Sequence, residues 1–461
     1  MSTVRPRFTA SIAALALLVA AVASLGVVGA PSAGAFTLPS FYDVPNPLPP
    51  GGPGTVIKTE PVTVAGLHGT MQRVMYKSKS IRGDDIAVTG LIATPDTPPP
   101  AGGYKVLSWA HGTTGMADQC APSLGAADAL PAVNAFLDKG WLVTGTDYEG
   151  LGTPGLHPYI VGDSEARGVI DIVRAARDLS SDVSTDYVVW GHSQGGHASM
   201  FTAHIAHTWA PELHLVGAVA GAPPSQLNLV YDFLKTSPYK YYLLMVGGAI
   251  NAAYGDAAAP IGDVLNAQGQ SMLPLLDEGC TDLLAEKSEG LDVQSLMVQQ
   301  ADGTYNPFSN PVWGPLIAAQ DPANFSTPVD TPILIIHGGA DEQIPTVSSQ
   351  ILAGQLCATG QNIERWMYPG RSHAGVIAPS LTSMTDWIAA RFAGEPAPDA
   401  AAPTGQDDID DTICSDGKML SRADYEKPST NGNGSGNGNH TGGGSTAPVA
   451  TPVRNQPTFT G

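Results

Sequence analysis

The chain has 461 residues, and its 22 lysine and arginine residues against 42 acidic ones leave a formal net charge of −20. This balance argues against a nucleic-acid partner and against charge-driven binding to an anionic membrane surface. The roughly 425 residues after position 35 can form one large domain with an insertion, or two domains.

The first 35 residues have the pattern of a secretory signal. Arg5 and Arg7 precede the apolar run SIAALALLVAAVASLGVVGA, and the small residues AGA end the segment. This order predicts cleavage before Phe36 and a protein that is secreted or lies in the cell envelope. A retained membrane anchor is the alternative, because about 20 apolar residues can span a bilayer.

The middle of the chain has the pattern of an α/β fold. Two segments with partial alternation, VTVAGLHGTMQRVMYKS and IAVTGLIATP, predict antiparallel strands that open the domain. Short apolar runs follow, separated by helix-like segments: KVLSWAHG, GWLVTGTDY, DYVVWGHS, LVGAVAGAP, PILIIHGGAD and IERWMYPG. Such runs are typical of parallel strands buried on both faces. We therefore expect a mainly parallel central sheet flanked by helices.

One segment is too long to be a simple connection between adjacent strands. Residues 224–330 separate two of the apolar runs, and we expect them to form an inserted, mainly helical lid. The core would then comprise residues 36–223 and residues 331–425. Residues 426–461 are rich in glycine, asparagine and proline and predict a disordered tail.

The sequence YVVWGHSQGGHAS contains a candidate nucleophile, Ser193, within a GxSxG pattern. An apolar strand precedes the pattern and a helix-like segment follows it, which is the setting in which GxSxG presents a serine on a strained turn. Side chains at Gly191 or Gly195 would crowd the neighbouring strand and helix. We also expect the backbone N–H of Gln194 to donate to an oxyanion.

A serine nucleophile needs a histidine base and a carboxylate that orients the base. Asp341 follows the strand PILIIH and His373 follows the strand IERWMY, so both lie where carboxyl ends of parallel strands meet. This gives the chain order serine, acid, histidine of the α/β-hydrolase fold. His337 is a rival base, but no acid upstream of it in this region follows a strand. Glu342 is the rival acid.

The second oxyanion donor is expected from the loop after the strand KVLSWA. We place it at Thr113, with Thr114 as the alternative. His111 in the same loop fits loop architecture better than a catalytic role.

Neither a metal nor another cofactor is predicted. His197, His204 and His207 can share one helical face, but no acidic residue is interleaved as in HExxH. The four cysteines of this exported chain predict two disulfides with three possible connectivities. They are Cys120, Cys280, Cys357 and Cys414.

The sequence also resembles a known family, the secretory lipases of the lipase-A type. The resemblance spans most of residues 40–425 and is carried by HGTTG with DQCAPS, TDYEGLGTPGLHPYIVGDSEARGVIDIVRAAR, GHSQGGHA, HGGADEQIP and SHAG. It implies an α/β-hydrolase fold with a helical lid, the triad Ser193, Asp341 and His373, an oxyanion hole near Thr113 with the N–H of Gln194, and hydrolysis of acylglycerols and other esters. It also implies that Cys120 pairs with Cys280 and Cys357 with Cys414.

These patterns predict a secreted serine hydrolase, a triacylglycerol lipase or esterase, that forms an acyl-enzyme. Its partner would be an ester or acylglycerol at a lipid–water interface, with no stable protein partner. Two alternatives stay open. An exported acyltransferase would use the same triad and present an acceptor other than water. A non-catalytic interaction protein on a hydrolase scaffold is disfavoured, because every triad position is intact.

Overall fold

The computed structural model describes residues 36–398, 403–404 and 408–427. The predicted signal at residues 1–35 lies outside this range. So does the predicted tail at residues 426–461, except for Glu426 and Lys427.

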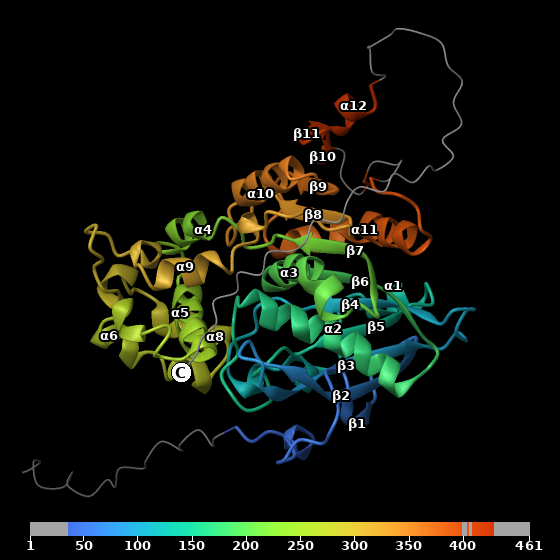
Figure 1. Ribbon diagram of the computed structural model, residues 1–461, viewed down its shortest axis with the longest axis horizontal. Helices are drawn as coiled ribbons and strands as arrows, with labels where there is room; N and C mark the ends of the chain where they lie inside the picture. Colours follow the sequence, from blue (N-terminus) through green and yellow to red (C-terminus); the bar gives the residue numbers. More distant parts are fainter. Residues whose placement is uncertain (1–35, 399–402, 405–407, 428–461) are drawn as a thin grey trace, which may run out of the picture.

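A mixed sheet of eleven strands runs through the molecule (Figure 1) in the order β1-β2-β3-β5-β4-β6-β7-β8-β9-β10-β11. The strands are β1 (Val56–Val62), β2 (Gly69–Lys79), β3 (Asp85–Pro95), β4 (Tyr104–Ala110), β5 (Leu142–Thr146), β6 (Val183–His192), β7 (His214–Gly221), β8 (Ile333–Gly338), β9 (Ile363–Tyr368), β10 (Asp410–Ser415) and β11 (Lys418–Ser421). The six neighbouring strands β5, β4, β6, β7, β8 and β9 pair in parallel, and the pairs on either side of them are antiparallel. The predicted fold class is therefore confirmed.

Some helices of the chain cover the two faces of the sheet, and others lie beside it. They are α1 (Val133–Leu137), α2 (Gly162–Leu179), α3 (Gln194–Trp209), α4 (Leu227–Leu234), α5 (Tyr241–Tyr254), α6 (Ala267–Ser271), α7 (Leu275–Glu278), α8 (Thr281–Ser288), α9 (Trp313–Ala318), α10 (Thr346–Ala358), α11 (Ile377–Phe392) and α12 (Arg422–Tyr425). Apolar residues of α2, α3 and α10 share one core cluster with the sheet, and those of α1 and α11 share a second. The parallel strands are thus buried on both faces, which explains their continuous apolar runs.

Residues 224–330 connect β7 to β8 through the helices α4 to α9 and short 3₁₀ turns. Most of their apolar side chains pack together in a separate hydrophobic cluster. From outside the segment, Met116 and residues 159–161 also belong to this cluster. Figure 1 shows these helices, coloured green to yellow, beside the sheet. We call residues 224–330 the helical segment below.

Two disulfides join distant parts of the chain. Cys120–Cys280 links the loop after β4 to the helical segment, and Cys357–Cys414 links α10 to β10. These are the pairs that the family resemblance implies. The antiparallel hairpin of β10 and β11 was not predicted, although residues up to about 425 were expected in the fold.

The turn from β6 to α3 packs tightly against β4, which lies beside β6 in the sheet. A Cβ atom at Gly195 would overlap the carbonyl oxygen of Ala110, and one at Gly191 would overlap the carbonyl group of Gly195. Overlap with backbone atoms cannot be relieved by a side-chain rotation. Both glycines of the predicted turn are therefore required by sterics.

We predict that Gly195→Ala destabilises the protein by about 3 kcal/mol, because α3 must move away from β4. Gly354→Ala is the matched control, since an added Cβ on this α10 residue meets no atom within 4 Å. Alanine is preferred over glycine in helices, so this change should stabilise by about 0.5–1 kcal/mol. Chemical denaturation followed by circular dichroism measures both, and equal stability of Gly195→Ala and wild type would contradict the packing argument.

Candidate active site

Ser193 lies at the turn between β6 and α3, as predicted for a nucleophile elbow. Its backbone has φ 60° and ψ −121°, a conformation that side chains rarely adopt. The N–H of Ser193 donates to the carbonyl oxygen of Gly221 on β7 at 2.9 Å. The strained turn is thus held by the neighbouring strand, and Ser193 lines two cavities at once.

Asp341 and His373 come together from loops after adjacent strands. The Nδ1–H of His373 donates to Oδ2 of Asp341 at 2.7 Å. Burial alone would raise the pKa of Asp341, but hydrogen bonds from His337 and His373 hold it well below its usual range. Asp341 therefore stays ionised and orients the imidazole.

The other ring nitrogen of His373, Nε2, is a candidate proton acceptor. Among the described residues, its Nε2 is buried and has no hydrogen-bond partner. His373 and Ser193 line the same cavity. Since Nδ1 carries the hydrogen that bonds to Asp341, Nε2 of the neutral ring has none and can accept a proton within that cavity.

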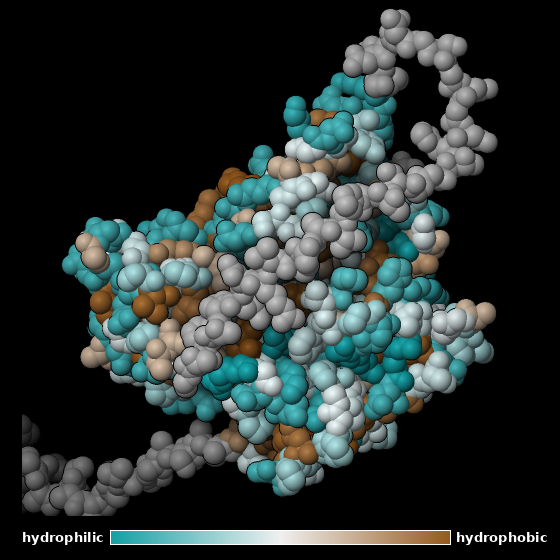
Figure 2. Space-filling model, viewed as in Figure 1, coloured by the Kyte–Doolittle hydropathy of each residue, from teal (hydrophilic) through white to brown (hydrophobic). Residues whose placement is uncertain are grey.

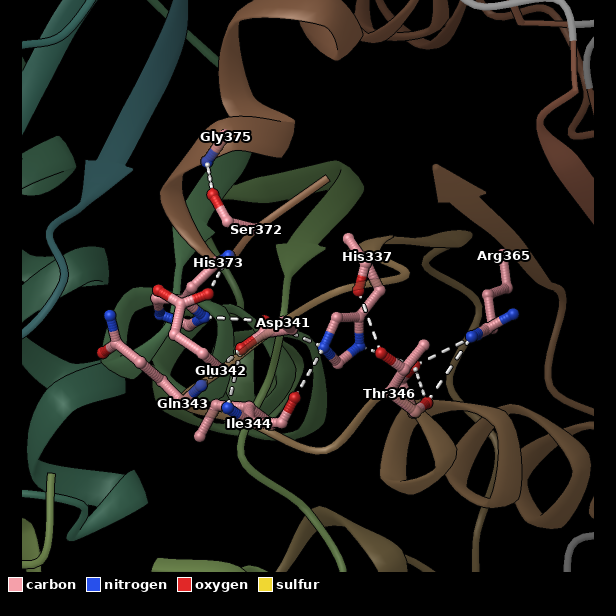
Figure 3. A network of polar contacts seen from close by, with 12 residues as sticks. His337, Asp341, Glu342, Gln343, Ile344, Thr346, Arg365, Ser372, His373 and Gly375 are labelled. Carbon is pink, nitrogen blue, oxygen red and sulfur yellow. Dashed lines mark hydrogen bonds and ion pairs between the residues drawn. The ribbon is translucent and has the colours of Figure 1, made fainter. Parts of the chain in front are cut away.

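His337 and Glu342, the rival base and the rival acid, bond to Asp341 and to the backbone of His373, respectively (Figure 3). His337 lies behind Asp341, fully buried, with its Nε2 3.1 Å from Asp341 Oδ2. It is absent from the linings of both cavities at Ser193. The Glu342 carboxylate accepts the backbone N–H of His373 at 3.0 Å. The sequence did not indicate this contact of His337 with the acid, although their spacing of four residues across the loop is compatible with it.

The loop after β4 borders Ser193 as expected. A Cβ atom added to Gly112 would lie 3.7 Å from Cβ of Ser193. Thr113 and Thr114 both line the cavity that Ser193 and His373 share. The Thr113 hydroxyl donates to the Tyr159 hydroxyl at 3.1 Å, which leaves the backbone N–H of Thr113 as its donor for an oxyanion.

The helical segment fixes this loop in place. The N–H of Thr281 donates to the carbonyl oxygen of Thr114 at 3.1 Å, and Gly115 pairs with Cys280 in an isolated antiparallel bridge. The Cys120–Cys280 disulfide lies at the same point. The backbone bridge, which includes the Thr281 bond, and the disulfide therefore join the loop of the candidate oxyanion donor to the start of α8.

Gln194 begins α3, so its backbone N–H has no partner within the helix and can face an oxyanion. Its side chain is tethered by groups that the sequence did not single out. Gln194 Nε2 donates to Oε1 of Glu165 at 2.9 Å and to Nε2 of His157 at 2.7 Å. Burial lowers the pKa of His157 to about 3, so this ring is neutral and can accept.

Glu165 also forms a buried ion pair. Its Oε2 lies 2.6 Å from Nδ1 of His197, and both side chains are fully buried. Burial lowers the pKa of His197, but Glu165 outweighs burial and the net shift is upward. The Nε2 of His197 donates to the carbonyl oxygen of Gln320 in the helical segment at 2.7 Å. His197 thus supports the elbow.

The two cavities at Ser193 differ in polarity. The first is apolar, encloses about 860 Å³ counting its open mouth, and takes most of its lining from the helical segment, including Leu234, Val246 and Trp313. The second contains the polar groups of Thr113, Gln343 and His373. Among the described residues, no cluster of three or more His, Cys, Asp or Glu side chains could hold a metal ion.

The fold is shared with solved hydrolases. Lipase A of Candida antarctica matches with a TM-score of 0.68 and 22% identity, over 80% of this chain and 89% of that chain. The rice cell wall degrading esterase LipA of Xanthomonas oryzae matches with a TM-score of 0.60 and 21% identity, over 74% and 98%. These matches show that the chain has the α/β-hydrolase fold.

A family described as secretory lipase matches residues 126–400, more than half of the chain. The chain belongs to this family of secreted carboxylic ester hydrolases. Lipase A of Moesziomyces aphidis is 27% identical over 75% of this chain and 79% of its own length. A probable inactive lipase of Mycobacterium tuberculosis is 27% identical, over 78% and 84%. A secreted triacylglycerol lipase of Malassezia globosa is 24% identical, over 77% and 81%.

Within residues 36–398, 403–404 and 408–427, no helix is long and apolar enough to cross a bilayer.

The ion pair beneath the elbow predicts a pH dependence of stability. The folded pKa of His197 exceeds its unfolded value of about 6.5, so its contribution is complete below pH 6.5 and is lost as pH rises through the folded pKa. Relative to Glu165→Gln, we expect the free energy of unfolding of wild type in urea to fall as the pH rises from 6.5 to 9. The other buried histidines have lowered pKa values, so near pH 6.5 they bind protons only in the unfolded state and make stability rise with pH. This contribution is common to wild type and Glu165→Gln, and the difference between the two slopes therefore reports the ion pair.

His207→Gln is the control, because His207 is exposed on the same helix. It should keep the slope of wild type. Equal slopes in Glu165→Gln and wild type would show that the pair is not the cause.

Proposed function

We propose that this protein hydrolyses carboxylic esters, and triacylglycerols in particular, through Ser193, His373 and Asp341. The observation that carries the proposal is the 2.7 Å bond from His373 Nδ1 to Asp341, which leaves Nε2 facing the cavity of Ser193. This is the arrangement that activates a serine for acyl transfer.

The reaction follows from the positions of these groups. Ser193 Oγ attacks the ester carbonyl while His373 Nε2 takes its proton. The N–H groups of Gln194 and Thr113 stabilise the oxyanion, and His373 returns the proton to the departing alcohol. Water then attacks the acyl-enzyme by the same steps. The low pKa of Asp341 keeps it a carboxylate throughout, so the proton stays on His373.

The apolar cavity supports an acyl chain as the group next to the ester carbonyl. Its lining offers hydrocarbon contacts, and the more polar cavity on the other side of Ser193 can accept the alcohol part. The name of the Malassezia globosa relative supports triacylglycerols as the ester. We propose the helical segment as a lid, because it supplies most of the acyl side of the site.

Contact with a lipid–water interface is part of this proposal. Figure 2 shows apolar residues at the surface of the helical segment, on the left of the view. Phe233 and Val312 of this segment are about two-fifths exposed. Exposed apolar groups of this kind can contact an oil phase.

The name of the Mycobacterium tuberculosis relative raises the alternative of an inactive hydrolase. The intact bond between Asp341 and His373 favours activity in this chain. An exported acyltransferase would have the same groups and differ in the acceptor. The product of the reaction therefore separates the three functions.

We expect wild type to release free fatty acid from a triacylglycerol emulsion and from p-nitrophenyl esters with C2 to C16 acyl chains. Ser193→Ala should lower kcat at least about 10³-fold, because the acyl-enzyme cannot form. Ser199→Ala is the matched control, since this α3 hydroxyl donates to the carbonyl oxygen of Gly195 and Ser199 lines neither of the two cavities at Ser193.

Added alcohol tests the acceptor. Acyl transfer to the alcohol as the main reaction would favour the acyltransferase. The absence of turnover by folded wild type would favour the inactive protein.

A second variant tests the acyl site. Gly247 on α5 lines the apolar cavity, and a Cβ atom there would meet no atom within 4 Å. Gly247→Leu should therefore fold normally and project into the cavity. We expect kcat/KM to fall about 10-fold or more for C12 to C16 esters and little for C2 to C4 esters. Equal losses for short and long chains would argue against this cavity as the acyl site.

A further inference from the structure

The carboxylate of Asp341 has more partners than a triad requires. Its Oδ1 accepts the backbone N–H groups of Gln343 and Ile344, both at 2.8 Å. Its Oδ2 accepts from His373 Nδ1 at 2.7 Å and also lies 3.1 Å from His337 Nε2. Figure 3 shows the two imidazoles on opposite sides of the carboxylate. Asp341 is thus shared between the candidate base and a second histidine.

The surroundings of His337 decide where its proton lies. Its Nε2 faces two acceptors, Asp341 Oδ2 and the carbonyl oxygen of Ile344 at 3.2 Å. That nitrogen must therefore carry hydrogen. Burial lowers the pKa of His337, although Asp341 acts in the opposite direction, so the ring is neutral and its Nδ1 is an acceptor.

A serine and an arginine complete the network behind His337. Ser349 Oγ lies 2.7 Å from His337 Nδ1 and 3.0 Å from the carbonyl oxygen of Thr346. A neutral ring with hydrogen on Nε2 has none on Nδ1, so the shorter contact is a hydrogen bond only if the Ser349 hydroxyl donates to Nδ1. Arg365 Nε donates to the same Ser349 oxygen at 3.0 Å. Ser349 is fully buried on α10, and Arg365 is buried on β9. Hydrogen donation therefore runs in one direction, from Arg365 through Ser349 and His337 to Asp341.

We propose that His337 is a positioning residue that holds Asp341 and, through it, sets the proton affinity of His373. Ser349 and Arg365 fix the tautomer of His337 that this role needs. The inference rests on the proposed function, since it assigns the means by which the base of that reaction is tuned.

The physical cause is the sharing of one negative charge among several donors. Each N–H given to Oδ2 draws charge from it and weakens its pull on the proton of His373 Nδ1. Without His337, Asp341 would stabilise the imidazolium of His373 more strongly, and His373 would hold its proton more tightly. A base with a higher pKa is protonated at higher pH, so the acid limb of activity would move upward.

Other titratable and charged groups face this network and are common to all the variants below. They are His192 on β6, Tyr239 in the helical segment, Glu342 in the loop after β8, and Arg365 on β9 with Asp410 on β10. Differences between variants therefore report the changed residue.

Two pairs of substitutions test the hydrogen bonds that run from Ser349 through His337 to Asp341. His337→Leu removes the donor to Asp341, whereas His337→Gln can keep an N–H near the same place. Ser349→Ala removes the donor to His337. Ser348→Ala is its matched control, because Ser348 is also buried on α10 and its hydroxyl has no hydrogen-bond partner in the described part of the chain.

The readouts are the pH profiles of kcat/KM for p-nitrophenyl butyrate and of the rate of Ser193 modification by a fluorophosphonate. We expect the acid limb to move up by about half a pH unit to one unit in His337→Leu and by less in Ser349→Ala. His337→Gln should lie close to wild type, and Ser348→Ala should not move.

A folded His337→Leu with the pH profile of wild type would overturn the inference, as would equal shifts in Ser348→Ala and Ser349→Ala. If His337→Leu does not fold, the serine pair decides. Failure of the proposed function gives a different result: wild type then reacts with the fluorophosphonate without hydrolysing esters, or does not react at all. In the first case, the labelling profiles still decide the role of His337.

Discussion

The buried charge of Asp341 is the constraint on which the arrangement of the site depends. A carboxylate removed from water is tolerated only where donors replace the water, and here its oxygens accept from two backbone N–H groups and two imidazoles. These donors come from β8, its following loop and the loop after β9. They converge only while β8 and β9 stay in register. The Cys357–Cys414 disulfide and the pairing of β10 with β9 strengthen this edge of the sheet.

A second buried network surrounds Gln194 at the start of α3, and its two histidines differ in charge. His197 is held near a carboxylate and its pKa rises, whereas His157 is buried without one and its pKa falls to about 3. The charged ring anchors Glu165, and the neutral ring accepts from Gln194. Both contacts fix the start of α3. The turn at Ser193 and the loop of His373 are therefore each held by buried polar groups, and the cavity that both residues line lies between these two networks.

Much of this could be predicted from the sequence, because local patterns specify strands, turns and the residues that follow them. The parallel strands are continuous apolar runs, and the glycines around Ser193 are demanded by backbone contacts that GxSxG encodes. The contacts of Glu165 with Gln194 and of Ser349 with His337 depend on packing between α2 and α3 and between α10 and β8, which no local pattern specifies. Strands β10 and β11 were missed for another reason: they are short and partly exposed at the sheet edge, so they lack an apolar run.

The helical segment is joined to the catalytic core at points that bear on chemistry as well as on substrate binding. Thr281 and Cys280 hold the loop of Thr113 and Thr114, and Gln320 accepts from His197 beneath the elbow. The same segment supplies most of the apolar cavity. A movement that opened the cavity would have to leave both attachment points in place, or it would disturb the oxyanion donors. The helices α4 and α5, which line the cavity, are tied to the second attachment as well, because the N–H of Leu227 donates to Asp321 at 2.7 Å and the Gln320 side chain donates to the Tyr254 hydroxyl at 3.0 Å.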